Sequence, residues 1–266
     1  MENLTPEIKE LLFLLKKKIK VVAMLAPSFP VDFFYPEIIG MLKRLGFKYV
    51  VEVAKGAAET NRQLLALLKL RPHRRYITSP CPSIVRLIKN KYPDLVQFLT
   101  KIDSPMSATA KIVDKKYPGY KKVYIGPCFV KKLEAKEDYS KLDILVLTYK
   151  ELQRIFEIKK ISLKKKDKLS CFDISEFHTR LYPMSGGLAQ SSSLTVKLTD
   201  PEYDVISGPR LVEKTLKEFP VKTELKVLDI LYCDGGCING AGIITNDSLD
   251  RRRQKIISCW RQLKHQ

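Results

Sequence analysis

The chain has 266 residues, of which 45% are hydrophobic and 29% are charged, the balance of an ordinary globular protein. This length is sufficient for one large domain or for two closely packed lobes with a substantial core. No apolar run is long enough to cross a bilayer, and the N-terminal sequence lacks the features of a signal peptide. We therefore expect a cytoplasmic protein with no membrane insertion.

The formal net charge is +19, from 48 Lys and Arg against 29 Asp and Glu. Such a charge suits an acidic partner, which could be nucleic acid, anionic lipid or an acidic protein. The basic runs Lys16–Lys18, Lys164–Lys166 and Arg251–Arg253 are short, dispersed and not interleaved with aromatic residues. We therefore do not expect nucleic-acid binding, and a solvated lysine-rich surface is the simpler interpretation.

The first predicted element is a helix, because Thr5 can cap it, Pro6 suits its first position and Glu7 complements its dipole. Short β-rich runs then alternate with helical patterns, which predicts an α/β fold with mainly parallel sheets. The stretch 182–194, rich in glycine and serine, predicts an irregular loop. The predicted strands are Val21–Leu25, Tyr49–Val53, Arg75–Thr78, Val123–Ile125, Ile144–Leu147, Asp204–Ile206 and Leu225–Tyr232. The predicted helices are Asp32–Leu45, Thr60–Leu70, Pro82–Leu99, Pro105–Lys115, Lys150–Phe156, Arg210–Glu218 and Leu249–Leu263.

Four of the six cysteines follow predicted strands. Cys81 and Cys128 each stand between a strand-like run and a helical pattern, while Cys233 and Cys237 follow the last predicted strand. Open α/β sheets place ligands at the carboxyl ends of their strands. A helix N-terminus also stabilises a thiolate, which is the form of cysteine that binds metal. These four residues therefore predict a metal centre.

Two kinds of metal centre suit four thiolates. An iron–sulfur cluster is favoured because Cys237 lies in a glycine-rich loop, where the backbone can approach a bulky ligand and donate hydrogen bonds to its sulfides. A tetrahedral zinc site is the alternative, although zinc sites typically pair two close knuckles and only one close pair exists here. Cys171 and Cys259 are interpreted as packing residues. The glycines of the loop are Gly235, Gly236, Gly240 and Gly242.

Three segments carry a family resemblance. TSPCPSIVRLI, IGPCFVKKLEA and CDGGCINGAG, in this order, resemble the three cluster-binding motifs of the FeFe-hydrogenase catalytic domain, and APSF, DSPM and PMSGGL add to the match. The SPCP sequence is similar to that of the sensory or putative branch of the family. The resemblance implies two lobes of mainly parallel sheet flanked by helices, with an iron–sulfur cluster in the cleft between them. It covers nearly the whole chain, so we expect a single domain over residues 1–266 without a ferredoxin-like domain.

The resemblance also implies the cofactor and its ligands. Cys81, Cys128 and Cys233 would ligate a 4Fe–4S cubane, and Cys237 would ligate it and bridge to a di-iron subcluster that carries CO and cyanide. Such a di-iron unit would require hydrogenase maturation factors for its assembly.

Further side chains match positions near this cofactor. Lys131 matches a lysine that hydrogen-bonds a cyanide, and Glu134 matches a glutamate that would pair with a nearby cation. Ser104 matches a serine of the proton path, although a helix cap is an equally good interpretation of it. The predicted catalytic residues are thus Lys131 and Ser104. The predicted cofactor-binding residues are Ala26, Pro27, Ser28, Lys131 and Gly236.

The chain also departs from the family pattern. Pro80 stands where fast enzymes carry a cysteine that transfers protons, and the helical stretch TNRQLLALLKL lacks the glutamates of the proton path. Gly126 and Leu231 replace methionines that pack near the di-iron unit, and Ala241 replaces a common glycine. These departures keep the metal ligands but impair proton delivery, so we expect slow turnover.

Three functions remain open at this point. The first is slow dihydrogen oxidation or proton reduction, and the second is a non-catalytic module that senses dihydrogen or redox state. The third is a 4Fe–4S scaffold without the di-iron unit, similar to the narf-like relatives that act in iron–sulfur assembly. Because six cysteines leave none for a ferredoxin-like cluster, electrons would come from an acidic ferredoxin or a companion iron–sulfur subunit.

Overall fold

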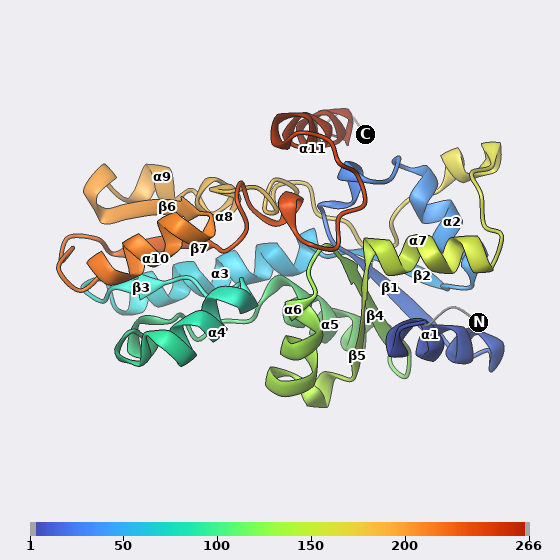
Figure 1. Cartoon of the computed structure of the whole chain (residues 1–266), viewed down its shortest axis with the longest axis horizontal. Coiled ribbons are helices and arrows are strands. Elements are labelled where there is room, and N and C mark those ends of the chain that lie inside the picture. The colour runs from blue at the N-terminus through green and yellow to red at the C-terminus, as the bar shows by residue number, and fades with distance from the viewer. Residues whose placement is uncertain (1–3, 264–266) are drawn as a thin grey trace.

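Two parallel β-sheets organise the chain, and the computed structural model describes residues 4–263 (Figure 1). The larger sheet has the strand order β2-β1-β4-β5, the smaller one has the order β3-β7-β6, and every pairing is parallel. This arrangement confirms the predicted α/β fold, and each predicted strand is present. The strands are β1 Val21–Leu25, β2 Tyr49–Glu52, β3 Tyr76–Ile77, β4 Lys121–Gly126, β5 Ile144–Thr148, β6 Tyr203–Ser207 and β7 Val227–Leu231.

Helices flank both sheets. The helices are α1 Pro6–Lys16, α2 Glu37–Leu45, α3 Ala54–Leu70, α4 Pro82–Lys91, α5 Pro105–Lys116, α6 Val130–Leu133, α7 Tyr149–Ile158, α8 Gly187–Ser191, α9 Leu194–Lys197, α10 Pro209–Glu218 and α11 Leu249–Leu263. Thr5 accepts a hydrogen bond from the Ile8 amide and Pro6 begins α1, as the sequence predicts. None of the helices within residues 4–263 is both long and apolar enough to cross a membrane.

The larger sheet is covered on both faces, which explains the uninterrupted apolar sequence of its central strand β1. Val21, Ala23 and Leu25 belong to a core cluster shared with α1, α2 and α7. Val22 and Met24 point to the opposite face and share a second cluster with α5. The two clusters bury every residue of β1.

The smaller sheet is less completely buried and has a very short strand at one edge. Its central strand β7 packs through Leu228 and Ile230 on α4 and α10, and through Val227 on α3, α8 and α9. The edge strand β6 is only half-buried along its whole length, and β3 contains just Tyr76 and Ile77. The two sheets define two lobes, which we call the large-sheet lobe and the small-sheet lobe.

Some predicted boundaries were wrong. The helix expected over Pro82–Leu99 ends at Lys91, because Pro93 lacks an amide donor and constrains the residue before it; a 3₁₀ helix follows over Pro93–Phe98. Helix α3 begins at Ala54 rather than at Thr60, whose hydroxyl donates to the Gly56 carbonyl one turn earlier instead of capping.

The loop expected over 182–194 contains the short helix α8. The serine hydroxyls that suggested a loop bond back to the helix, since Ser191 donates to the Gly187 carbonyl and Ser192 donates to the Leu188 carbonyl. The helix expected over Asp32–Leu45 is shorter at its start and begins at Glu37, immediately after Pro36.

Candidate metal centre

The four cysteines of the predicted metal centre follow strands of both sheets. Cys128 lies just beyond β4 of the large-sheet lobe and two residues before the start of α6. Cys81 is the N-cap of α4, shortly after β3, and its carbonyl accepts hydrogen bonds from the first amides of that helix. Cys233 follows β7, and Cys237 opens the 3₁₀ turn Cys237–Asn239. The large-sheet lobe thus supplies one cysteine and the small-sheet lobe supplies three.

The structure brings these four thiols close enough to influence one another. Burial raises the pKa of Cys233 to about 12, and negative charge on Cys81 and Cys128 contributes to the increase. Burial also raises the pKa of Cys237 well above its ordinary value, with further increases from charge on the other three cysteines. Four neighbouring thiolates are therefore costly unless metal cations lie among them, which fits a cluster of iron ions.

A cluster and a single metal ion require different arrangements of four thiols. Within residues 4–263, no group of three or more His, Cys, Asp and Glu side chains is placed to hold one metal ion. A tetrahedral zinc site requires four sulfurs at about 2.3 Å from one point. A cubane binds each thiolate through a different iron, so its four ligands do not have to converge on one point.

The loop that carries Cys237 packs tightly between two other backbone segments. The Ser185 amide donates to the Gly235 carbonyl at 3.0 Å, and the Gly242 amide donates to the Pro127 carbonyl at 2.8 Å. Gly236 has a φ of 102°, and a Cβ there would lie 2.5 Å from the Pro183 carbonyl oxygen. Gly236 is therefore required by backbone packing, and its predicted contact with the cofactor stays a prediction.

Lys131 and Glu134 form a buried ion pair beside the cysteines. Lys131 is 7% exposed, its Nζ lies 2.5 Å from Glu134 Oε2, and it also donates to the Pro80 carbonyl at 3.3 Å. Burial by itself would lower the pKa of Lys131, but Glu134, Cys128 and Cys81 outweigh this effect and raise it. The raised pKa favours the charged form of Lys131 near the thiols, and Glu134 pairs with this cation as the sequence predicts.

The predicted segment Ala26, Pro27 and Ser28 lies at the carboxyl end of β1 and contacts a tyrosine that the sequence motifs do not include. The Ser28 hydroxyl lies 2.7 Å from the Tyr149 hydroxyl, which donates to the Ala26 carbonyl at 3.1 Å. Burial raises the pKa of Tyr149 well above its ordinary value, and charge on Cys237 adds to the increase. Tyr149 thus links this segment to the surroundings of Cys237.

Two more buried tyrosines, Tyr124 and Tyr182, lie near Cys237. Burial raises the pKa values of Tyr124 and Tyr182, and charge on Cys237 contributes in both cases. The Tyr182 hydroxyl is buried and has no hydrogen-bond partner within residues 4–263, which fits a site that accepts a polar ligand. The sequence offered a signal for two of the three tyrosines, because Tyr149 directly follows a strand and Tyr182 directly precedes PMSGGL.

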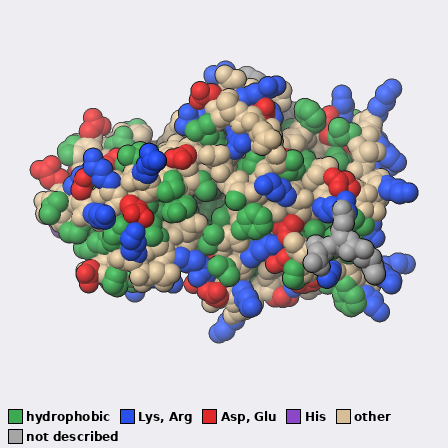
Figure 2. Space-filling view, in the orientation of Figure 1, with side chains coloured by type: hydrophobic (Ala, Val, Ile, Leu, Met, Phe, Trp, Pro, Cys, Tyr) green, Lys and Arg blue, Asp and Glu red, His purple; other side chains and the backbone are tan. Residues whose placement is uncertain are grey.

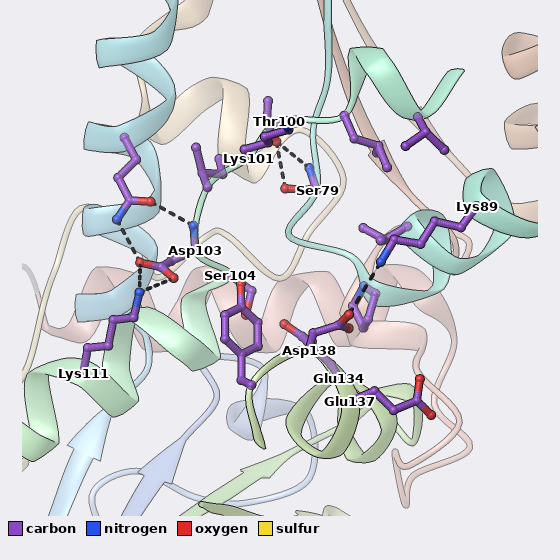
Figure 3. A pocket seen from close by; sticks show the side chains of 17 residues that line it. Ser79, Lys89, Thr100, Lys101, Asp103, Ser104, Lys111, Glu134, Glu137 and Asp138 are labelled. Atoms are coloured by element: carbon purple, nitrogen blue, oxygen red, sulfur yellow. Dashed lines mark hydrogen bonds and ion pairs between the residues drawn. The ribbon is translucent and has the colours of Figure 1, made fainter. Parts of the chain in front are cut away.

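A cavity of about 730 Å³ opens beside this site (Figure 3). Ser104 and Glu134 both line it, and Figure 3 shows them on opposite elements that face the same space. Asp103 lines it too and pairs with Lys111 at 2.7 Å and with Gln63 at 3.1 Å. Ser104 caps α5 by accepting from the Ser107 amide, so the alternative interpretation of this serine as a helix cap is confirmed.

The two remaining cysteines lie apart from the four. Cys171 is exposed, whereas Cys259 is buried on α11 beside the ion pair of Arg180 and Glu52. Burial raises the pKa of Cys259 to about 12, and none of the four clustered cysteines contributes to this increase. The structure therefore gives neither residue a position in the candidate metal centre.

Similar sequences include both enzymes and assembly proteins. The chain is 24% identical to iron hydrogenase 1 of Clostridium pasteurianum over 77% of this chain and 45% of that protein. It is 26% identical to the cytosolic Fe-S cluster assembly factor NAR1 of Kluyveromyces lactis over 81% of this chain and 62% of that protein. The chain thus spans less than two thirds of the length of these relatives.

Similar structures have the same fold. HydA1, an FeFe-hydrogenase from Chlamydomonas reinhardtii solved as a variant, superposes with a TM-score of 0.71 at 18% identity, covering 95% of this chain and 88% of that chain. A structure that describes oxygen inactivation of FeFe-hydrogenase superposes with a TM-score of 0.70 over the same shares. Residues 19–241 match the family described as iron only hydrogenase large subunit, C-terminal domain. The chain belongs to this family, and it is an iron–sulfur hydrogenase-like domain.

Proposed function

We propose that Cys81, Cys128, Cys233 and Cys237 hold a 4Fe–4S cubane, and that Cys237 also bridges to a di-iron subcluster. The observation that carries this proposal is the placement of the four half-buried cysteines, which follow strands of both sheets. They lie close enough that charge on some of them raises the pKa values of Cys128, Cys233 and Cys237. Metal cations relieve this repulsion, because they bind the thiolate form and displace the proton. The buried ammonium of Lys131 favours additional anionic ligands on the same side.

The proposed activity is slow dihydrogen oxidation or proton reduction. When bound, a di-iron unit with CO and cyanide supplies the reversible chemistry of dihydrogen, while the protein supplies orientation and proton access. Lys131 would provide buried N–H donors to such a unit, and Glu134 holds its ammonium in place. The side chain of Pro80 has no titratable group, so position 80 cannot pass a proton. The only polar group that Pro80 offers is its carbonyl, which already accepts a hydrogen bond from Lys131.

Proton access would instead start from the cavity. Glu134 lines the cavity and contacts Lys131, so this ion pair connects the cavity wall to the lysine that lies near Cys128 and Cys81. Ser104 lines the same cavity, but its hydroxyl already caps α5. A route of this kind is less direct than a titratable side chain at position 80, which is the reason for expecting slow turnover.

A second candidate is a 4Fe–4S scaffold without the di-iron unit. The similarity to NAR1, at 26% identity, is comparable with the similarity to iron hydrogenase 1, at 24%. Pro80 also favours a function that requires no proton relay. A sensing module would use the same cluster and is distinguished from the enzyme by its lack of turnover.

An electron partner is part of the proposal. The net charge of +19 suits an acidic ferredoxin or a companion iron–sulfur subunit. In Figure 2 the Lys and Arg side chains are spread over the whole visible face and are interspersed with Asp and Glu. Long-range attraction would therefore come from the overall charge, and the association rate should fall as ionic strength rises. An association rate that is independent of salt would count against this partner.

The first experiment tests the cubane. Protein reconstituted without oxygen with iron and sulfide should contain one cubane per chain and give the paramagnetic resonance spectrum of a reduced 4Fe–4S cluster. Cys171→Ala and Cys259→Ala serve as matched controls that should bind the same amount of iron. A protein that binds a single zinc ion and no iron–sulfur cluster would overturn the proposal.

The second experiment separates the candidate functions. Infrared spectra of protein produced with hydrogenase maturation factors should contain CO and cyanide stretching bands if the di-iron unit is present. A spectrum without these bands leaves only the scaffold. If the bands are present, Pro80→Cys should raise the dihydrogen turnover of the enzyme, and an unchanged rate would contradict the proton-relay argument.

A further inference from the structure

Helix α11 (Leu249–Leu263) lies outside the stretch that matches the family, residues 19–241. In Figure 1 it is the dark red helix that crosses the molecule above the junction of the two lobes. It packs on two short turns, Cys237–Asn239 and Phe29–Val31, which belong to the surroundings of the candidate metal centre. Because α11 contacts both turns, its side chains can control how they sit relative to one another.

One arginine of α11 binds the turn that follows Cys237. Arg252 Nη1 donates to the Asn239 side-chain oxygen at 2.7 Å and to the Ile238 carbonyl at 3.3 Å. Its Nη2 donates to the Thr245 carbonyl at 2.8 Å, beyond the glycine-rich loop. A guanidinium presents its donors in a rigid fork, so these three bonds define the position of the turn and not merely its distance from the helix.

The same end of α11 is attached to the large-sheet lobe. Lys255 donates to the Val31 carbonyl at 2.8 Å. Asp32 accepts from the Ile244 and Thr245 amides at 2.9 Å each. Thr245 therefore connects Arg252 to Asp32. Through these bonds the turn Cys237–Asn239 is held in place relative to the large-sheet lobe, which supplies Cys128.

The neighbouring arginines make no such contacts. Arg251 pairs with Asp247 at 3.6 Å and Arg253 pairs with Asp250 at 3.1 Å, and both pairs are partly or largely exposed to solvent. Within residues 4–263, neither arginine forms a hydrogen bond or an ion pair with the loop that carries Cys237. Arg251 and Arg253 carry the same charge as Arg252 and lie on the same helix, so they are matched controls for it.

We infer that Arg252 is a positioning residue for the metal centre, which fixes the turn Cys237–Asn239 so that the Cys237 thiol keeps its place among the other three. This inference rests on the proposed function, in which Cys237 is a ligand. Removing the guanidinium frees the Ile238 carbonyl and the Asn239 amide group, and the turn gains conformations in which the thiol is displaced. Removing the guanidinium therefore changes the geometry of one ligand, Cys237, while the other three cysteines keep their positions.

The test uses the full chain with Arg252→Ala, and with Arg251→Ala and Arg253→Ala as controls. Because hydrogen bonds to charged groups are lost, amide hydrogen exchange in the turn of the apo-protein should be about tenfold faster in Arg252→Ala and unchanged in the controls. After reconstitution, only Arg252→Ala should change the paramagnetic resonance spectrum and shift the reduction potential of the cluster. Arg252→Lys, which keeps the charge without the fork, should give an intermediate result.

Asn239→Ala is a second variant, because it removes one acceptor without touching α11. It should change the spectrum in the same direction as Arg252→Ala by a smaller amount. A spectrum and potential that match the parent in both variants would overturn the inference, even if exchange is faster, because the role of Arg252 would then be structural only. A parent that binds no cluster would overturn the proposed function, whereas the exchange experiment on apo-protein would still decide whether Arg252 holds the turn.

Discussion

The large-sheet lobe and the small-sheet lobe differ in how well their strands are buried. All five residues of β1, at the centre of the large sheet, are buried between two core clusters. In the small sheet, β6 is half-buried throughout and β3 contains two residues. The core clusters of the large-sheet lobe contain more buried apolar residues than those of the small-sheet lobe, so we expect the large-sheet lobe to be the better stabilised.

The ligands are distributed in the opposite way. Cys81, Cys233 and Cys237 come from the small-sheet lobe, and only Cys128 comes from the large-sheet lobe. A ligand that binds the folded state stabilises the elements that carry its contacts. The comparison therefore indicates that the small-sheet lobe gains most from the metal centre, while the large-sheet lobe holds its shape without it.

The largest expected effect concerns the single ligand of the large-sheet lobe. Cys128→Ala should lower iron binding to the same low level as Cys81→Ala, because a cubane that loses one of four thiolates is exposed to solvent and exchange. Iron and sulfide content after reconstitution measures this. A Cys128→Ala protein that keeps the parent's iron content would mean that the small-sheet lobe binds the cluster alone.

The second prediction separates the two lobes directly. Reconstitution should slow amide exchange in β7 by about a hundredfold, the value for a ligand present at a hundred times its dissociation constant, and should affect β1 much less. Exchange measured by mass spectrometry on apo and reconstituted protein provides the comparison. Equal protection of β1 and β7 would contradict the difference between the lobes.

The third prediction concerns a buried acid of the small sheet. Burial raises the pKa of Asp229 to about 6 from its ordinary value of 3.8, and the Ala189 amide donates to its carboxylate at 3.2 Å. The raised folded-state pKa adds stability that is fully present below about pH 4 and is lost as pH rises through about 6, a change of about 3 kcal/mol at most. Asp229→Asn should therefore gain stability relative to the parent between about pH 4 and 7.

Denaturant unfolding of the apo-proteins at several pH values measures this difference. The amide of the variant keeps an oxygen that can accept from Ala189, so the comparison isolates the carboxylate charge. A stability difference that is the same in acid and at neutral pH would show that ionisation of Asp229 does not influence folding.

The smallest effect concerns ion pairs between the lobes. Arg86 of α4 pairs with Glu137 at 2.8 Å and with Asp138 at 3.6 Å, both in the π-helical segment Glu134–Asp138 that follows α6. The acidic partners are exposed, so Arg86→Ala should lower the free energy of unfolding by less than about 1 kcal/mol. The loss should shrink further at high salt. A much larger, salt-independent loss would mean that this pair, and not the metal centre, holds the lobes together.

The strands and the ligand positions could be predicted from sequence because both depend on local patterns. Buried parallel strands are short apolar runs, and the run Val21–Leu25 coincides with β1. The four cysteines follow strand-like runs and lie in distinctive motifs, and these two local features are enough to indicate a common site. Helix boundaries were less predictable, since Thr60 has the properties of a cap and yet lies inside α3, where it bonds to Gly56.

What only the tertiary structure decided is which residues surround the ligands. The hydroxyl of Tyr149 forms a hydrogen bond with Ser28, and the ammonium of Lys131 donates to the Pro80 carbonyl. Arg252 donates to Asn239 in the turn Cys237–Asn239. These partners are far apart in sequence or belong to different elements, so no local spacing encodes them. The sequence by itself determined the strands and the candidate ligands through short-range patterns, whereas long-range packing of two sheets and α11 decided the environment of the thiols.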